Sequence, residues 1–254
     1  MEWQDEGILL KAEKLGERKA VATFFTREHG NHAGLIQNIT AKNNIGWLQP
    51  GNSLQIQWFA RLEDQLGVFS WQALGNHVAD FIFSPLKLLL LQSTLGLIGL
   101  LLPDRLPYPD LYAKTLNLLA GDAAKGQSEP ILLQNYIFWE LYFLAAIGYG
   151  LDLSVCALTG SREQLAYVSP KTGRAASLAA GLPYAGRLLA LPQFLLSNFL
   201  LGDDQHQAGE ISQQELQQGL ALTGYFLEKL LKEQKNTLLP PARQRLSSLL
   251  LASE

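Results

Sequence analysis

The hydrophobic pattern of this chain changes near residue 78, and the change divides it into a strand-forming part and a helix-forming part. Before residue 78, apolar residues alternate with polar ones over short runs that turn residues separate. After it, apolar residues recur at helical spacing over much longer runs. Alternation is typical of half-buried strands, and recurrence every three or four residues is typical of helices. We therefore predict an α+β protein with a first domain at 1–77 and a helical domain at 78–254.

The first domain should contain five short strands. The run SLQIQWFARL shows the clearest alternation, with Leu54, Ile56 and Trp58 on one face and Phe59 on the other. The other runs are GILLKAEKL, KAVATFFTR, HAGLIQNIT and LGVFSWQAL, and the breaks LGE, REHGN and LQPGN hold turn residues. Because closure removes exposed strand edges, five such strands favour a small closed barrel.

The second domain should be built from long helices. Ser84-Pro85 and Glu129-Pro130 are typical helix starts, and the first of these helices should stop at Pro103. Further helices are expected at 107–121, with Gly121 as the stop, and at 188–203 and 211–234. The apolar run 86–102 is interrupted by Lys87 and polar residues, which indicates a buried helix and no membrane partner.

Charge is unevenly distributed along the chain. The net charge is −3, but residues 7–62 carry seven Lys/Arg and three acidic residues, a net of +4 (7 − 3). The remaining residues hold 13 basic and 20 acidic residues, a net of −7 (13 − 20). This asymmetry indicates an anionic partner for the barrel. The alternative is chance variation across a solvated surface.

Several functional classes find no support in the sequence. A single cysteine fits a reducing cytoplasm, and the N-terminus MEWQDEGILL is acidic before it is apolar, unlike a signal peptide. There is no P-loop, nucleophile elbow or zinc-protease motif. His29 and His32 amount to half a metal site, and as turn residues they are more often solvated. We expect neither catalysis nor a cofactor, and a cytoplasmic protein.

The chain resembles the RecO family of recombination mediator proteins. The resemblance rests on GILLKAEKLGERKAVATFFTREHGNHAGLI, LQPGNSLQIQWFARLEDQLG, LLPDRLPYPDLYAKTLNLL, FWELYFLAAIGYGLDLSVCALTG and AYVSPKTGRAASLAAGLPYAGRLLALPQFLL, in this order. It implies an OB-fold barrel followed by a helical domain. It also implies binding to single- and double-stranded DNA, annealing of single strands, and loading of a RecA-type recombinase onto strands coated with single-strand-binding protein. A RecR-type partner is expected, and the alternative is an adaptor whose barrel contacts protein.

The resemblance also implies a zinc-knuckle-like insert at about 152–187, from which the zinc ligands are missing. The positions where related proteins carry two Cys-x-x-Cys pairs hold Cys156 with Thr159 and Ser177 with Ala180. One thiol, two hydroxyls and a methyl cannot form a zinc site, so we expect no metal. The insert should instead be held by apolar packing of Leu158, Leu165, Tyr167, Val168 and Leu178. Cys156 is more typical of a small buried residue than of a reactive thiol.

Candidate binding residues follow from charge and aromaticity. OB-fold barrels bind single strands through a basic groove and through aromatic faces that stack on bases. The candidates for contact with DNA are Lys11, Lys14, Arg18, Lys19, Arg27, Lys42, Arg61 and Trp47 in the barrel, and Lys171 and Arg174, beside Arg187, in the insert. Phe25, Trp58 and Phe59 are further aromatic candidates. The alternatives are a solvated charge for each cation and barrel core for each aromatic residue.

A second candidate site lies early in the helical domain. The resemblance implies that this domain receives the acidic, apolar-ended C-terminal tail of single-strand-binding protein. Such a tail needs cations beside an apolar slot. Arg105, between Leu102-Pro103 and Leu106-Pro107, and Lys114 meet that description. The alternative is that Arg105 caps the preceding helix.

Overall fold

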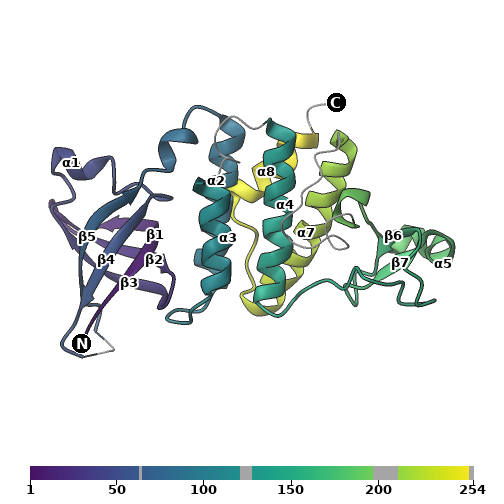
Figure 1. The fold of residues 1–254 in the computed structure, drawn as a ribbon, viewed down its shortest axis with the longest axis horizontal. Helices are drawn as coiled ribbons and strands as arrows, with labels where there is room; N and C mark the ends of the chain where they lie inside the picture. Colours follow the sequence, from purple (N-terminus) through teal and green to yellow (C-terminus); the bar gives the residue numbers. More distant parts are fainter. Residues whose placement is uncertain (63–64, 121–127, 197–210, 252–254) are drawn as a thin grey trace. The chain divides into compact units, whose positions relative to one another are not determined.

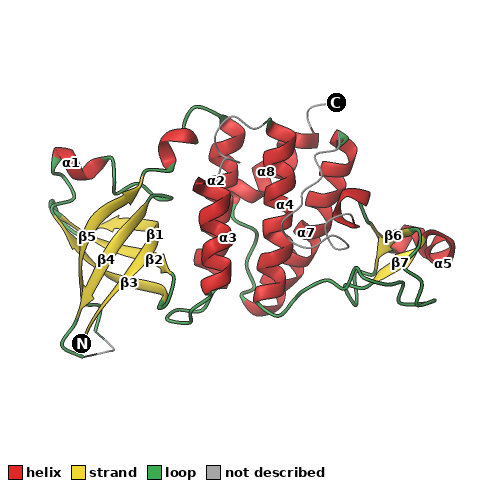
Figure 2. Cartoon of the chain, in the orientation of Figure 1, coloured by secondary structure: helices red, strands yellow, loops and turns green. Residues whose placement is uncertain are grey.

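The computed structural model describes residues 1–62, 65–120, 128–196 and 211–251. The chain divides into two compact units: one holds Met1–Gln127 with Pro240–Arg243, and the other holds Ser128–Leu239 with Gln244–Glu254. The ribbon shows the barrel strands, the helices and a small second sheet along the chain (Figure 1). The predicted α+β class is confirmed (Figure 2).

The first unit begins with the predicted five-stranded closed barrel. Its strands are β1 (Glu2–Lys14), β2 (Lys19–Thr26), β3 (Gly30–Gln37), β4 (Ser53–Phe59) and β5 (Val68–Gly75), and a short helix α1 (Lys42–Ile45) joins β3 to β4. They close in the order β1-β2-β3-β5-β4. All neighbours are antiparallel except β3 and β5, which pair in parallel through the single register pair Leu35 and Val68. The barrel is therefore weakly closed at the β3–β5 seam.

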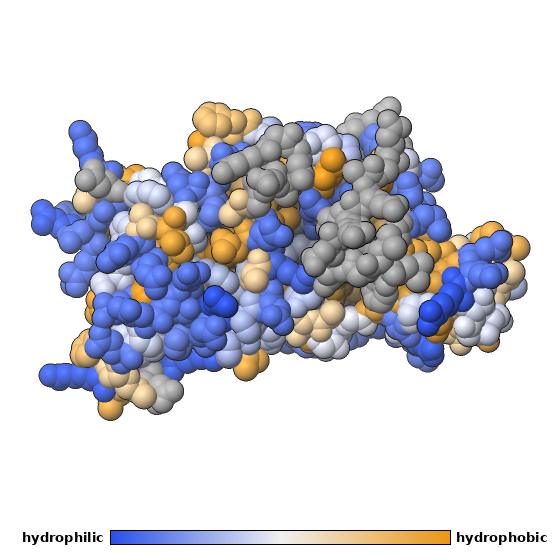
Figure 3. All heavy atoms as spheres, in the orientation of Figure 1, coloured by the Kyte–Doolittle hydropathy of each residue, from blue (hydrophilic) through white to orange (hydrophobic). Residues whose placement is uncertain are grey.

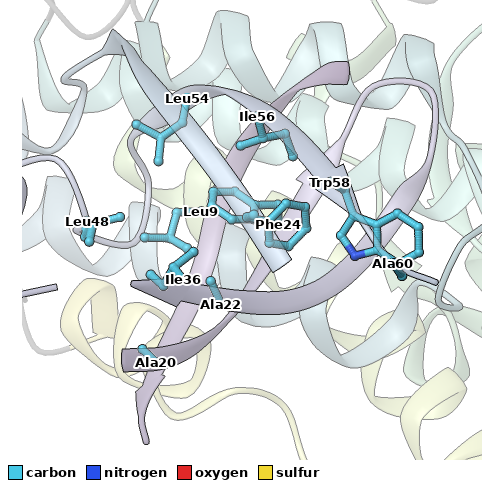
Figure 4. Close-up of a cluster of buried hydrophobic side chains, with 11 residues drawn as sticks. Leu9, Ala20, Ala22, Phe24, Ile36, Leu48, Leu54, Ile56, Trp58 and Ala60 are labelled. Carbon is cyan, nitrogen blue, oxygen red and sulfur yellow. The ribbon is translucent and has the colours of Figure 1, made fainter. Parts of the chain in front are cut away.

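Alternation builds the barrel core as the sequence predicts. Along β4, Leu54, Ile56 and Trp58 are buried, and Figure 4 shows them with the inward side chains of the other strands. Phe59 points outward with 54% of its surface exposed. Trp58 and Phe25 are core residues, so their candidacy as stacking faces is wrong. The Trp58 indole N–H donates to Leu66 O at 3.1 Å, and Phe25 packs on Tyr112 at 5.6 Å between ring centroids.

Two helices follow the barrel in the first unit: α2 (Pro85–Leu101), after a short 3₁₀ turn at Val78–Asp80, and α3 (Pro109–Ala120). The Ser84 side chain accepts from Lys87 N at 3.3 Å, which confirms the predicted start of α2. The predicted stop of α3 at Gly121 lies outside the described residues. At the start of β3, Asn31 Nδ2 donates to Ile98 O at 3.2 Å, and Asn31 O accepts from Arg105 N at 2.9 Å. The barrel is therefore bonded directly to the α2–α3 loop.

The second unit is built on α4 (Glu129–Ala146) and α7 (Gln213–Gln234), which pack together. The face of α7 that carries Leu216, Leu220 and Leu227 is buried, and Ser212 caps the helix together with Glu215. Of the helix expected at 188–203, residues 193–196 are helical and residues 197–203 lie outside the described residues. The prediction is wrong for 188–192, where Leu189–Ala190 form a short strand, because Pro192 disfavours a helix in the residues before it. The last helix, α8 (Pro241–Leu251), was not predicted from the sequence.

The insert folds around a three-stranded sheet of order β7-β6-β8. Its elements are β6 (Leu165–Val168), β7 (Ala175–Ser177), α5 (Leu178–Gly181), a 3₁₀ helix at Leu182–Arg187 and β8 (Leu189–Ala190). Leu165 and Val168 are buried as expected, but the expectation for Leu158 and Leu178 is wrong, since 63% and 48% of their surfaces are exposed. Leu158 lies within the turn at 157–159, and Leu178 is the first residue of α5, directly after β7. Figure 3 shows hydrophobic side chains gathered over β6, β7 and α5.

None of the helices in the described part of the chain combines the length and the hydrophobicity that a membrane span requires.

Candidate nucleic-acid interface

The net charge of the whole barrel differs from the net charge of residues 7–62, on which the sequence-based prediction rests. Strand β1 starts at Glu2, so the barrel includes Glu2, Asp5 and Glu6, which a count over 7–62 leaves out. Residues 1–77 contain seven Lys/Arg and eight Asp/Glu, a net of −1 (7 − 8). The expected net positive barrel is therefore wrong, and any attraction for an anion depends on how the charges are distributed.

Four cations gather at one end of the barrel. Lys14 ends β1, Arg18 and Lys19 lie at the start of β2, and Lys42 starts α1. The backbone brings these segments together, because Lys19 pairs with Gln37 at the end of β3 and Ile39 N donates to Arg18 O at 3.3 Å. We call Lys14, Arg18, Lys19 and Lys42 the basic end. All four are exposed, and Glu17 is the acidic residue in the same turn.

The other predicted cations of the barrel lie elsewhere. Arg27 follows β2 and pairs with Glu28 at 3.3 Å, and Arg27 N donates to Glu6 O. Arg61 follows β4, beside Ala60, whose N donates to Met1 O at 3.0 Å. These positions lie toward the start of β1, opposite the basic end. Lys11 lies on β1 and pairs with Glu13 at 3.3 Å.

Acidic side chains are organised at this opposite end. Asp5 is buried and accepts from Glu6 N and Glu28 N, each at 2.8 Å, and lies 2.9 Å from His29 Nδ1. The His29 ring stacks on Trp3 with 4.0 Å between centroids. The network fixes the β2–β3 turn. Because the acids Glu2, Asp5, Glu6 and Glu28 are at one end and the basic end is at the other, the barrel is electrically polarised despite its low net charge.

A pocket of about 660 Å³ opens at the weakly closed β3–β5 seam. Its lining residues come from the end of β3, from α1 and the turn after it, and from β5: Gln37, Asn38, Asn44, Trp47, Val68, Phe69, Ser70, Trp71, Gln72 and Ala73. Trp47 and Trp71 are half-buried and pack against the barrel core. Asn44 Nδ2 donates to Asn38 O at 3.0 Å, which ties α1 to the end of β3.

Trp47 was predicted from the sequence as a binding residue, whereas Trp71 was not. Trp71 alternates with Ser70 and Gln72 in LGVFSWQAL, a pattern that already predicts an inward-facing ring on β5. The alternation does not show which residues surround Trp71, because that depends on where β3 and β5 separate in space.

His32 is buried on β3 among the rings of Trp3, Trp58 and Phe69, with 6% of its surface exposed. Neither ring nitrogen has a hydrogen-bond partner among the described residues. Burial lowers the pKa of His32 from 6.5 to about 4, and the positive charges of Arg105 and His29 add to this. The imidazole is therefore neutral in the folded protein near neutral pH.

We predict that His32 makes the protein sensitive to mild acid. Its pKa of about 4 in the folded state lies below the ordinary value, so its contribution to stability is complete above about pH 6.5 and is lost as the pH falls toward 4. The loss amounts to roughly 3 kcal/mol. Urea unfolding gives the difference in the free energy of unfolding between the wild type and His32→Gln. This difference should decrease by about that amount from pH 7 to pH 4. A difference independent of pH would contradict the assignment.

In the insert, two of the positions that correspond to zinc ligands in related proteins, Thr159 and Ser177, contact the sulfur of Cys156. Cys156 is buried, with 1% of its surface exposed, and Ser177 N donates to Cys156 Sγ at 3.3 Å. Burial raises the pKa of the thiol, but hydrogen bonds from Thr159, Ser177 and Leu158 outweigh it and lower the pKa to about 6. The hydroxyls of Thr159 and Ser177 therefore interact directly with the thiol. Within the described residues, no group of three or more His, Cys, Asp or Glu side chains could hold a metal ion.

The cations of the insert lie on its exposed loops. Arg174 pairs with Asp152 at 3.4 Å, and the backbone carbonyl of Lys171 lies 3.5 Å from Lys229 Nζ. These cations belong to the second unit, and their part in DNA contact stays a prediction. In the first unit, Arg105 is exposed in the α2–α3 loop with φ of 59°, and Lys114 is half-buried on α3. The tail slot at these two residues also stays a prediction.

The fold is that of an OB-type barrel followed by a helical body. The family model "Recombination protein O N terminal" matches residues 1–73, and "Recombination protein O C terminal" matches residues 83–239. The DNA repair protein RecO of Rhodospirillum centenum is 41% identical over 247 residues, 96% of this chain and 93% of that protein. The RecO proteins of Methylocella silvestris and Ruegeria sp. are 40% and 41% identical, each over 96% of this chain and over 94% and 96% of their own lengths. The chain belongs to the RecO family of DNA repair and recombination proteins.

Proposed function

We propose that this protein is a non-enzymatic recombination mediator whose barrel binds DNA through the basic end. It would anneal complementary single strands and help load a RecA-type recombinase onto strands coated with single-strand-binding protein, together with a RecR-type partner. The observation that carries the proposal is the gathering of Lys14, Arg18, Lys19 and Lys42 at one end of an OB barrel in a RecO family member. Cations placed in this way can follow a phosphate backbone while the rest of the barrel repels it.

The structure refines which residues we expect to contact DNA. The basic end faces away from Asp5 and Glu28, so a strand bound there avoids the acidic residues. Arg27 and Arg61 lie toward the acidic end, and Lys11 is already paired with Glu13. We therefore expect these three to contribute less than the basic end. Lys171, Arg174 and Arg187 of the insert remain candidates for a second contact.

The alternative function is an adaptor whose barrel contacts protein and for which DNA affinity is incidental. The half-buried Trp47 and Trp71 at an open seam would also suit a protein ligand. The two functions differ in their salt dependence and in their need for the basic end, so both are tested by the same variants.

We predict that Arg18→Ala/Lys42→Ala lowers the affinity for a labelled single strand by about tenfold, roughly 1.4 kcal/mol, because two phosphate contacts are lost. The rate of annealing of two complementary labelled strands should fall with it. The matched control is Arg27→Ala/Arg61→Ala, which removes the same charge at the opposite end of the barrel. Fluorescence anisotropy measures the first effect, and energy transfer between the two strands measures the second. Equal losses in both double variants would place the interface elsewhere.

A further inference from the structure

The pocket at the β3–β5 seam is suited to a planar, uncharged group with polar edges. Its floor and walls are aromatic, since Phe69 is buried and Trp47 and Trp71 present half-buried rings. Its rim is rich in carboxamides, with Gln37, Asn38, Asn44 and Gln72. A carboxamide both donates and accepts hydrogen bonds, and the ten lining residues include no ionisable side chain. The volume of about 660 Å³ falls within the usual range for small-ligand sites, about 300–1,000 Å³.

Cations border this uncharged pocket. Gln37 of the lining pairs in register with Lys19, and the residue after Asn38 is bonded to the Arg18 carbonyl. Lys42 starts α1, the helix that contributes Asn44. A ligand in the pocket would therefore lie beside the basic end. The arrangement fits a molecule with a neutral planar part and an attached anionic chain.

We propose that the seam pocket receives one unstacked nucleobase of a bound single strand, while the basic end holds the flanking phosphates. The base would stack on Trp47 or Trp71, and the carboxamides would bond its edges. Stacking on tryptophan accepts any base, and carboxamides can match both donors and acceptors on base edges. The inference rests on the proposed function and adds to it a contact that depends on the base and not on the phosphate.

The base-dependent part of the affinity can be separated by experiment from the phosphate-dependent part. Abasic oligonucleotides keep the phosphates and lack the bases, so the basic end should bind them whereas the pocket should not. We expect a thymine oligonucleotide to bind the wild type at least about fivefold more tightly than an abasic strand of equal length. In Trp47→Ala and Trp71→Ala, affinity for the thymine strand should fall by roughly 5- to 100-fold, and affinity for the abasic strand should hardly change. The control Phe83→Ala removes an exposed aromatic ring outside the barrel and should change neither affinity.

Because Trp47 and Trp71 also pack on the core, their alanine variants could lose affinity by unfolding. A second variant therefore tests the pocket without changing a core residue. Gln72 is exposed on β5, so Gln72→Glu should leave the melting temperature unchanged and weaken thymine binding by placing a carboxylate at the pocket rim. The matched control is Gln4→Glu, the same change at an exposed position on β1. Equal effects of the two glutamates would overturn the pocket assignment.

The outcomes distinguish this inference from the function on which it rests. If thymine and abasic strands bind the wild type equally, and Arg18→Ala/Lys42→Ala weakens both, the pocket holds no base but the barrel still binds DNA. If neither strand binds the wild type at low salt, the proposed function fails and the inference fails with it. A preference for the thymine strand that disappears in the Trp47 or the Gln72 variant supports the pocket.

Discussion

Replacing Gly30 with alanine is expected to lower the free energy of unfolding by about 4 kcal/mol or more. Gly30 has φ of +65°, and a Cβ placed there would lie 2.2 Å from Leu106 O and 2.6 Å from Leu106 N. These are backbone atoms of the α2–α3 loop, so no side-chain rotation can relieve the collision. The loop would have to leave β3, with loss of the hydrogen bond from Arg105 N to Asn31 O.

Gly16→Ala provides the matched control for this prediction. Gly16 has φ of +77°, but a Cβ there would have no neighbour within 4 Å. It should therefore carry only the left-handed strain, about 1–2 kcal/mol. Urea unfolding of the two variants isolates the contribution of the loop contact. A difference below about 1 kcal/mol between them would show that the barrel and the α2–α3 loop are not in the contact described.

Glu140→Ala is expected to destabilise the helical unit by about 3–5 kcal/mol. Glu140 is fully buried on α4, where it accepts from the Tyr136 hydroxyl at 2.7 Å and from Thr223 Oγ1 of α7 at 2.5 Å. Removal of the carboxylate takes a shared acceptor away from two buried hydroxyls, at roughly 1–3 kcal/mol for a lost buried hydrogen bond, and leaves a cavity between the two main helices. Thr223 Oγ1 also lies 3.2 Å from Gly219 O, so the cavity should account for much of the loss. Near-UV circular dichroism during urea unfolding should report the loss.

Two smaller changes in the same cluster test whether the hydrogen bonds to Glu140 account for the loss of stability. Tyr136→Phe and Thr223→Val each remove one donor and keep most of the packing volume, so each should cost about 1–2 kcal/mol. If Glu140→Ala costs no more than either of them, the carboxylate does not join α4 to α7 as described. A non-additive double variant of Tyr136 and Thr223 would further support a shared acceptor.

Local sequence patterns were sufficient for most of the secondary structure. The alternation around Leu54, Ile56 and Trp58 predicts β4 and its buried face, and Ser84-Pro85 predicts the start of α2, because both signals act within a few residues. Helix α8 was missed because PARQRLSSLLL is short and only moderately amphipathic. The run EWQDE at the start of β1 gives no strand signal of its own. It becomes a strand through pairing with β4, which lies about fifty residues away in sequence.

The candidate site was harder to predict because it depends on such distant pairings. The charge count failed when the acidic start of β1 proved to be part of the barrel. Likewise, Lys42 joins Arg18 and Lys19 only because the end of β3 pairs with the start of β2. Trp71 reaches the pocket because β3 and β5 share a single register pair before they separate. In the insert, neither the contact of Thr159 and Ser177 with Cys156 nor the exposure of Leu158 and Leu178 was predicted, because both depend on how the turns and the small sheet are arranged in space.

The salt dependence of single-strand binding tests the central claim most directly. If the barrel neutralises about 3–5 phosphates, the logarithm of the association constant should fall against the logarithm of salt concentration with a slope of about −2 to −3.5. Arg18→Ala/Lys42→Ala removes two of these contacts, so its slope should be flatter by about 1.4, while that of Arg27→Ala/Arg61→Ala should match the wild type. A wild-type slope near zero, or the same slope in both double variants, would contradict a DNA interface at the basic end of the barrel.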